Sequence, residues 1–307
     1  MSLPRLIAGL SEIAPHHDAL ICDVWGVVHD GQRHHPAAAD ALYRFKERHG
    51  PVVLLTNAPR VPAEVAAQCA SYGLPPDCYD AIVSSGGAAR EELARRSGGA
   101  SARSVATAYG RATNEKDHCL PLYYIGPDRD LPMIEGLNVR RASMAEAEVA
   151  LAIGLRDDMV ETPADYEGEL AEMKAMGLPM LCANPDLVVH RGERLVYCAG
   201  TLAANYEKLG GEAIYYGKPH RPIYESALAA AAQAAKTVGR QSPKRPLAVG
   251  DGLLTDIKGA NGAGLEALYI ADGVHGEEVE PYTAEHLAAL FTRFGAEAGS
   301  VTRRLAW

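Results

Sequence analysis

The chain of 307 residues has no excess of positive charge and no closely spaced pair of cysteines. Its 30 Lys and Arg residues are outnumbered by 39 Asp and Glu residues, which gives a net charge of −9. A surface of that sign repels nucleic-acid phosphates and anionic lipid, so neither is expected as a partner. The most apolar stretch, residues 227–235, is too short and too rich in alanine to span a bilayer. A small anionic substrate is still compatible with this net negative charge, provided that a cation in the binding site holds it.

The absence of a Cys-x-x-Cys pair among the six cysteines favours free, mostly buried thiols in a reducing compartment over disulfides or a zinc site. The first twenty residues also lack the basic region and apolar stretch of a signal peptide. We therefore predict a cytoplasmic protein. With 48% hydrophobic and 22% charged residues it has an ordinary globular composition, and its length suggests about two domains. Whether it forms a homo-oligomer stays open.

Short apolar runs alternate with helical patterns along the chain, which predicts βα units and a doubly wound, Rossmann-like parallel sheet in an α/β fold. One helix is expected to begin near Pro36 and end at Gly50, and another to begin at Thr162-Pro163 and end at Gly177. The predicted strands are Ala19–Asp23, Val52–Asn57, Ala81–Ser85, Leu122–Ile125, Val149–Ile153, Met180–Asn184, Ala213–Tyr216, Leu247–Asp251 and Leu268–Ile270.

Polar residues follow four of these strands: Asp23, Thr56-Asn57, Gly217-Lys218-Pro219 and Gly250-Asp251-Gly252. Ligands bind beyond the carboxyl ends of the strands in open parallel sheets, so the four segments are expected to converge on one crevice. The stretch 87–201 carries none of them and is predicted to be an inserted α/β cap domain. Residues 1–86 and 202–307 would then form the core. The insertion would be either a lid over the crevice, which we favour, or a decoration.

Each segment suggests a chemical role and also has a plain structural explanation. A buried carboxylate such as Asp23, followed by Gly26, could act as a nucleophile toward phosphorus, or it could merely form a turn. Thr56 and Asn57 could donate hydrogen bonds to a phosphoryl oxygen, although such residues are also common in turns. Lys218 could neutralise a phosphate and the attacking carboxylate, or it could be a solvated surface residue.

Asp251 and Asp256 are the candidate metal ligands. Two carboxylates near the strand that ends at Asp23 suit Mg²⁺, which prefers a few carboxylates plus water and phosphate. The plain alternative is that Asp256 only caps a helix. No G-x-G-x-x-G sequence follows the first strand, and no G-x-S-x-G sequence supports acyl transfer.

Taken together, the four segments resemble the haloacid dehalogenase superfamily, most of whose members are Mg²⁺-dependent phosphatases that form an aspartyl-phosphate. The place of the insertion resembles class IIA of that superfamily, which acts on small phosphorylated metabolites. Residues 182–186, Cys-Ala-Asn-Pro-Asp, are similar to the Thr-Asn-Pro-Asp stretch of those caps, and residues 217–219 match their Gly-Lys-Pro.

The resemblance implies a role for each matching residue. Asp23 would be the nucleophile and a metal ligand, and the Trp25 backbone carbonyl a second ligand. Asp251 would bind Mg²⁺, and Asp256 would either bind it as well or lie next to its ligands. Lys218 would orient Asp23. The residues expected to contact substrate are Thr56, Asn57, Gly26, Asn184 and Asp186.

The sequence departs from the family at Trp25, where family phosphatases carry a second Asp that protonates the leaving group and then activates water. Such proton transfer is worth roughly 10²–10⁴ in rate. His29, which we rank first, and Asp30 follow on the same loop and could substitute. An aromatic residue also stands there in dehalogenases of the superfamily, so a metal-independent 2-haloacid dehalogenase and a weakly catalytic phosphometabolite-binding protein remain alternatives to a phosphatase.

Overall fold

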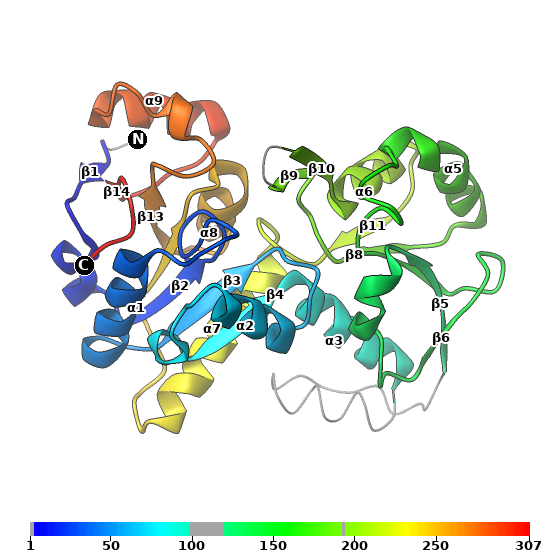
Figure 1. The fold of residues 1–307 in the computed structure, drawn as a ribbon, viewed down its shortest axis with the longest axis horizontal. Coiled ribbons are helices and arrows are strands. Elements are labelled where there is room, and N and C mark those ends of the chain that lie inside the picture. Colours follow the sequence, from blue (N-terminus) through cyan, green and yellow to red (C-terminus); the bar gives the residue numbers. More distant parts are fainter. Residues whose placement is uncertain (1–2, 99–118, 192–193) are drawn as a thin grey trace. The chain divides into compact units, whose positions relative to one another are not determined.

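The computed structural model describes residues 3–98, 119–191 and 194–307, and the chain forms two compact units (Figure 1). The first unit comprises Met1–Thr56, Ala63–Val83 and Lys218–Trp307, and the second comprises Asn57–Pro62 and Ser84–Gly217. Each unit has a sheet of its own, so residues 87–201 do not extend the sheet of the first unit.

The first unit contains a seven-stranded sheet in the order β1-β14-β13-β12-β2-β3-β4. Its strands are β1 (Arg5–Leu6), β2 (Ala19–Asp23), β3 (Val52–Thr56), β4 (Ala81–Ser84), β12 (Pro246–Gly250), β13 (Glu266–Ile270) and β14 (Ser300–Thr302). β2 runs parallel to both of its neighbours, β12 and β3. All five residues of β2 are buried, as expected for a strand that is covered on both faces.

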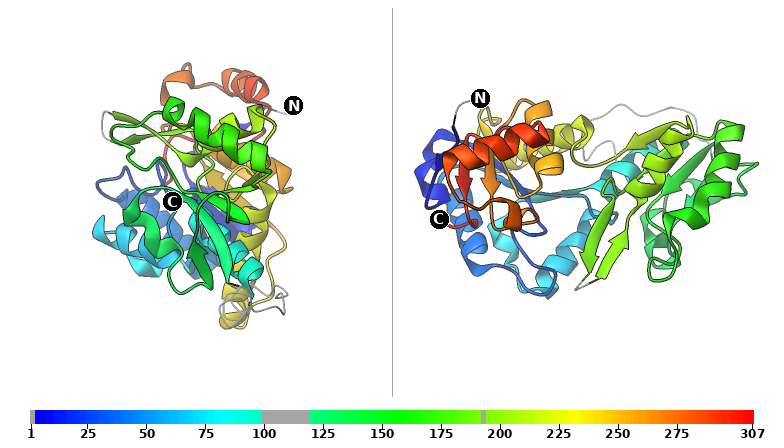
Figure 2. Two further views of the ribbon diagram at one scale, coloured as in Figure 1. Left: turned by 90° about the vertical axis from the view of Figure 1, so that its right-hand side faces the viewer. Right: turned by 90° about the horizontal axis from the view of Figure 1, so that it is seen from above.

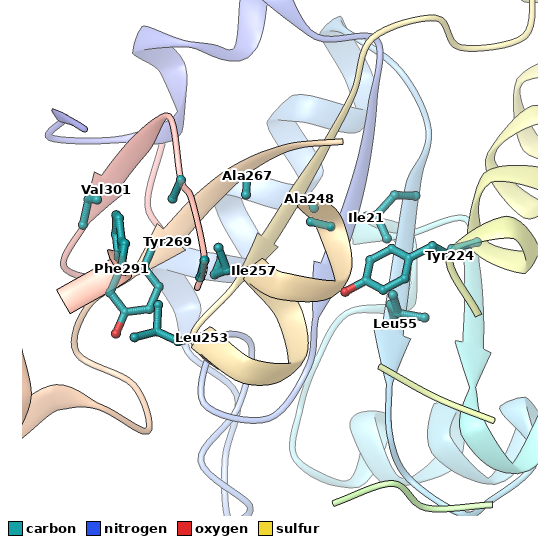
Figure 3. Packing of buried hydrophobic residues seen from close by; sticks show 14 of the residues in the cluster. Ile21, Leu55, Tyr224, Ala248, Leu253, Ile257, Ala267, Tyr269, Phe291 and Val301 are labelled. Atoms are coloured by element: carbon teal, nitrogen blue, oxygen red, sulfur yellow. The ribbon is translucent and has the colours of Figure 1, made fainter. Parts of the chain in front are cut away.

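Helices supply that cover. They are α1 (Pro36–Arg48), α2 (Pro62–Ser71), α7 (Arg221–Thr237), α8 (Lys258–Gly262) and α9 (Ala284–Phe294). One cluster of buried side chains joins α7, α8 and α9 to the central strands. Figure 3 shows Tyr224 of α7 beside Ile21 of β2 and Leu55 of β3 in this cluster. Burying apolar area at about 25 cal/mol per Å² makes this packing the main stabilising contribution of the unit.

The second unit contains a five-stranded sheet in the order β11-β8-β7-β5-β6, with all of its strand pairs parallel. Its strands are β5 (Leu120–Ile125), β6 (Val139–Arg141), β7 (Val149–Ala152), β8 (Met180–Cys182) and β11 (Ala213–Tyr215), and a separate antiparallel pair is formed by β9 (Val188–Arg191) and β10 (Arg194–Tyr197). The helices α5 (Glu167–Met176) and α6 (Ala199–Lys208) pack in one apolar cluster with this sheet, and α3 (Ser85–Ser97) packs in another. Figure 2 shows the helices and strands of each unit from two further directions, coloured along the sequence.

The predicted α/β fold class is confirmed, and each of the nine predicted strands is present with small shifts at its ends. The helix expected at Pro36 begins there. The one expected at Thr162 starts as a short 3₁₀ turn, Pro163–Tyr166, under a capping box, and continues as α5 to a left-handed Gly177. The strands that the sequence did not predict are β1, β6, β9, β10 and β14.

The second unit ends at Gly217, whereas the sequence placed the end of the inserted domain at residue 201. The reason is the packing of α6, whose Leu202 and Tyr206 lie in the core of the second unit, and the pairing of β11 with β8. These contacts assign residues 202–217 to the second unit. The predicted boundary was based on where polar residues follow strands, and that pattern carries no information about the packing of α6 or the pairing of β11.

All six cysteines are free thiols, and five of them are buried, with Cys119 exposed; the prediction of free, mostly buried thiols is confirmed. Within the ranges that the structure describes, no helix is both long and apolar enough to cross a membrane.

The packing of α6 yields a stability prediction. A Cβ added to Gly200 would overlap the backbone carbonyl oxygens of Pro185 and Asp186, so Gly200→Ala is expected to cost about 1–3 kcal/mol of unfolding free energy. The matched control is Gly168→Ala in α5, where a Cβ meets nothing within 4 Å. That change is expected to be neutral or to stabilise by up to about 1 kcal/mol. Thermal unfolding of both variants measures the difference, and equal Tm values would contradict the close approach of α6 to residues 185–186.

Candidate functional site

The site is built around Asp23, the last residue of the buried strand β2. Lys218 stands immediately before the turn that leads into α7, and its ammonium ion-pairs with the Asp23 Oδ1. The same Lys218 Nζ donates a hydrogen bond of 2.6 Å to Oδ1 of Asp256. Asp23 is 6% exposed and Lys218 is 3% exposed, so both charges are held away from water. Such buried charges persist in folded proteins when they are paired in this way.

Three carboxylates meet at this point. Asp251 follows β12, and Asp256 lies in a π-helical turn, Leu253–Ile257, that precedes α8. Asp23, Asp251 and Asp256 each offer an oxygen within 4.8 Å of the others, and all three are buried. Backbone donors fix two of them: Val274 N–H donates to Asp251 Oδ2 at 2.8 Å, and Gly252 N–H donates to Asp256 Oδ2 at 2.9 Å.

The electrostatics of the cluster show a deficit of positive charge. Burial, followed by repulsion from Asp23, raises the pKa of Asp251 well above its usual range and that of Asp256 to about 6. Burial lowers the pKa of Lys218, but attraction to Asp23 and Asp256 outweighs it and leaves that pKa raised. One ammonium cannot balance three carboxylates. Hard oxygen ligands that need a further cation fit Mg²⁺, and Asp23, Asp251 and Asp256 would hold it.

Four glycines crowd the metal-site carboxylates. A Cβ on Gly26 or Gly273 would overlap the carboxylate of Asp251, and one on Gly250 would overlap Asp256. A Cβ on Gly252 would overlap the Thr255 hydroxyl and lie 3.0 Å from Asp256 Oδ2. Gly26 also has a φ of +82°, which disfavours any other residue. The predicted substrate contact Gly26 therefore lies directly against Asp251.

Trp25 projects from the loop after β2 and is 49% exposed. The loop is closed by a hydrogen bond of 2.8 Å from Gly26 N–H to the carbonyl of His29. The Trp25 and His29 rings meet edge to face with centroids 5.3 Å apart, and His29 meets Tyr72 in the same way at 4.9 Å. On its other side, the Trp25 indole lies where a Cβ on Gly31 would be.

His29 and Asp30, the candidate substitutes for the missing acid, differ in their surroundings. His29 is buried, its Nδ1 accepts a hydrogen bond of 3.2 Å from Gly31 N–H, and burial lowers its pKa. Asp30 is exposed, and its Oδ1 accepts from the N–H groups of Gln32 and Arg33 at 2.9 Å each, which lowers its pKa. Asp30 thus stabilises its own turn.

The remaining predicted substrate contacts fall in both units. Thr56 ends β3 in the first unit and is buried. In the second unit, Asn57 Nδ2 donates to Asp186 Oδ1 at 2.8 Å, and Asn184 Oδ1 accepts from Asp186 N–H at 3.2 Å. The second unit therefore brings Asn57, Asn184 and Asp186 together, although 129 positions separate Asn57 from Asp186 in the chain.

Sequence reasoning missed Tyr224, Gly273 and Val274. The Tyr224 hydroxyl donates to the carbonyl of Asp256 at 2.9 Å and anchors the π-helical turn. Gly273 and Val274 act through their backbone, beside Asp251. The sequence could not predict these roles, because a tyrosine in a helical pattern and a Gly-Val pair after a strand are equally typical of ordinary packing.

Comparison with known proteins gives a consistent picture. Residues 20–117 match the family model of haloacid dehalogenase-like hydrolases, and residues 215–294 match a second model, HAD-hydrolase-like. The fold is similar to that of a hydrolase of the haloacid dehalogenase-like family from Brucella suis 1330, with a TM-score of 0.78, 36% identity, and coverage of 97% of this chain and 99% of that one.

Two curated proteins are also similar in sequence. The D-glycerol 3-phosphate phosphatase of Mycobacterium tuberculosis is 27% identical over 269 residues, which cover 87% of this chain and 66% of that enzyme. The ribonucleotide monophosphatase NagD of Escherichia coli K12 is 28% identical over 263 residues, which cover 83% of this chain and 88% of that enzyme.

The carboxylate cluster predicts a metal-dependent change in stability. Mg²⁺ is expected to bind the wild type and raise its Tm. At a Mg²⁺ concentration of one hundred times the Kd, the free energy of unfolding should increase by about 2.7 kcal/mol. Asp251→Asn should abolish that response and raise the Tm of the metal-free protein, because it removes one of three mutually repelling carboxylates. Calorimetric titration and thermal unfolding test this, with Asp40→Asn on α1 as the control. Equal Mg²⁺ affinity in wild type and Asp251→Asn would refute the assignment.

Proposed function

We propose that this chain, which belongs to the haloacid dehalogenase-like hydrolase family, hydrolyses small phosphate monoesters through an aspartyl-phosphate on Asp23. The observation that carries the proposal is the buried Asp23 carboxylate, joined to Lys218 and grouped with Asp251 and Asp256. The names of the similar curated proteins support the reaction type, since both are phosphatases. The chain spans 66% of the length of the mycobacterial enzyme, so the substrate of that enzyme is not carried over.

In the first step, an oxygen of Asp23 attacks phosphorus, and the bond from phosphorus to the ester oxygen breaks. The ester oxygen keeps the electron pair, leaves as an anion and is protonated by solvent water only after it has departed. In the second step, water attacks the same phosphorus and releases a proton to solvent, the bond to Asp23 breaks, and inorganic phosphate leaves with the carboxylate restored. The Asp23 carboxylate is held for this reaction by Lys218, whose ammonium fixes the orientation of Oδ1.

The other residues bind and balance charge. Thr56 and Asn57 donate hydrogen bonds to phosphoryl oxygens, and Lys218 offsets the negative charge of the attacking carboxylate. Asp23, Asp251, Asp256 and the Trp25 carbonyl would hold Mg²⁺, which would offset the charge of the phosphoryl group. In the second unit, Asp186 links Asn57 to Asn184, because its carboxylate accepts from Asn57 Nδ2 and its backbone N–H donates to Asn184 Oδ1.

The residue two positions after the nucleophile, Trp25, has no proton to exchange with an ester oxygen in the way that a carboxyl group does. The leaving oxygen therefore departs largely unprotonated. Dehalogenases of the superfamily also have an aromatic residue at this position, but the buried cluster of Asp23, Asp251 and Asp256 favours the metal-dependent phosphatase.

The free thiols, five of them buried, support a reducing cytoplasmic location.

The dependence of rate on the leaving group tests this mechanism. We expect kcat/KM to fall steeply from 4-nitrophenyl phosphate to phenyl phosphate to methyl phosphate, because the ester oxygen leaves with most of its charge. Asp23→Asn should abolish turnover of all three, since an amide is a poor nucleophile. Asp40→Asn is the control for the loss of one carboxylate elsewhere. Undiminished turnover in Asp23→Asn would overturn the mechanism.

His29 is the residue that we rank first as a substitute proton donor, and its variant separates protonation by His29 from departure of an unprotonated oxygen. Because burial lowers its pKa and Nδ1 already accepts from Gly31, we expect His29→Ala to leave the steep dependence unchanged. A shallow dependence in the wild type that becomes steep in His29→Ala would instead assign the proton to His29. A shallow dependence in both proteins would defeat both versions.

A further inference from the structure

We propose that the Trp25 indole is a stacking surface that selects phosphate esters carrying a planar aromatic ring next to the phosphate. This inference rests on the phosphatase function and specifies its substrate class. Trp25 is thereby a specificity-determining residue, and its side chain takes no part in the transfer of the phosphoryl group.

Trp25 is close in sequence to the proposed nucleophile and open to solvent. It stands two residues after Asp23, and the residue is 49% exposed. Val24, Val27 and Val28 of the same loop are buried, so the chain turns its apolar side chains inward and leaves the largest one outside. Single exposed aromatic residues are common on protein surfaces, so exposure alone carries no weight.

What distinguishes Trp25 is that its indole packs against other residues of its own loop. The ring meets His29 edge to face, and its six-membered part lies so close to Gly31 that a Cβ on Gly31 would overlap it. His29 is in turn held by Tyr72, and its Nδ1 by Gly31 N–H. The loop backbone is closed by hydrogen bonds of 2.8 and 3.1 Å from the N–H groups of Val28 and His29 to the carbonyl of Val24. A ring fixed before binding loses little conformational entropy when a ligand stacks on it.

The chemistry of the reaction favours the same ligands. An ester oxygen that leaves without a proton leaves best when it is attached to an aromatic ring, because that ring stabilises the developing negative charge. The indole also attracts planar rings by stacking, in addition to the effect of the apolar area that is buried. A tryptophan at position 25 cannot protonate the leaving oxygen as an aspartic acid would. It offers a stacking surface for aromatic esters, whose leaving groups depend least on protonation.

A pair of alkyl esters separates stacking from leaving-group chemistry. Benzyl phosphate and cyclohexylmethyl phosphate both release a primary alkoxide one methylene away from a six-membered ring, so their leaving groups differ little in basicity. Only the first ring is planar and aromatic. We expect the wild type to favour benzyl phosphate by about three- to tenfold in kcat/KM, mainly through a lower KM. Equal values for the two esters in an active wild type would overturn the inference without any variant.

Variants then assign the preference to Trp25. Trp25→Leu should bring the ratio of the two esters to about one, and Trp25→Phe should restore part of it. The control is Tyr43→Leu, which removes an aromatic side chain that is 43% exposed on α1 and should leave the ratio unchanged. A wild-type preference that persists in Trp25→Leu would place the recognition elsewhere and refute this role.

A binding measurement distinguishes failure of this inference from failure of the proposed function. In a Trp307→Phe background, Trp25 is the one remaining tryptophan of the chain, so its fluorescence reports on the loop. Benzylphosphonate, which cannot be hydrolysed, should change that fluorescence at a concentration about three- to tenfold lower than cyclohexylmethylphosphonate does. If none of the esters is turned over, the phosphatase proposal fails, and a preference for benzylphosphonate still supports stacking. Identical responses to the two phosphonates would contradict it.

Discussion

The paired contacts of Lys218 with Asp23 and Asp256 hold the rest of the site in place. Each partner comes from a different part of the chain: β2, the turn before α7, and the π-helical turn after β12. All three side chains are buried, and removing one partner of a buried pair leaves an uncompensated charge, which typically costs about 3–5 kcal/mol. The sheet order that puts β12 next to β2 is therefore a condition for the charges to persist, and the charges in turn fix where the loops that follow these strands can lie.

One helix connects the charges to the apolar core. Helix α7 begins shortly after Lys218, and its Tyr224 packs on Ile21 and Leu55 while its hydroxyl donates to the carbonyl of Asp256 (Figure 3). The same helix thus positions the ammonium at its start and the turn that carries Asp256. Because core packing tolerates little displacement, the position of this polar site is determined by the hydrophobic side chains beneath it.

Much of this arrangement could be predicted from the sequence. Short apolar runs predicted the strands, and the rule that polar strand ends of a parallel sheet share one edge predicted that Asp23, Lys218 and Asp251 would meet. The contacts of His29 with Trp25 and Tyr72 could not be predicted, because they depend on how a loop packs on the end of α2. Nor could the end of the second unit at Gly217, which depends on the pairing of β11 with β8, or strands as short as β1, which show no periodicity.

The positions around Asp251 and Asp256 fall into two kinds: those that tolerate a different side chain and those that must be glycine. Gly26, Gly250 and Gly273 have no side chain, and a Cβ at any of them would overlap Asp251 or Asp256, whereas one at Gly252 would overlap the Thr255 hydroxyl. The side chain of Trp25, half in solvent, can be exchanged without disturbing that enclosure. A substitution at position 25 can therefore change which substrates are accepted without moving the carboxylates, whereas a substitution at one of the glycines against them cannot.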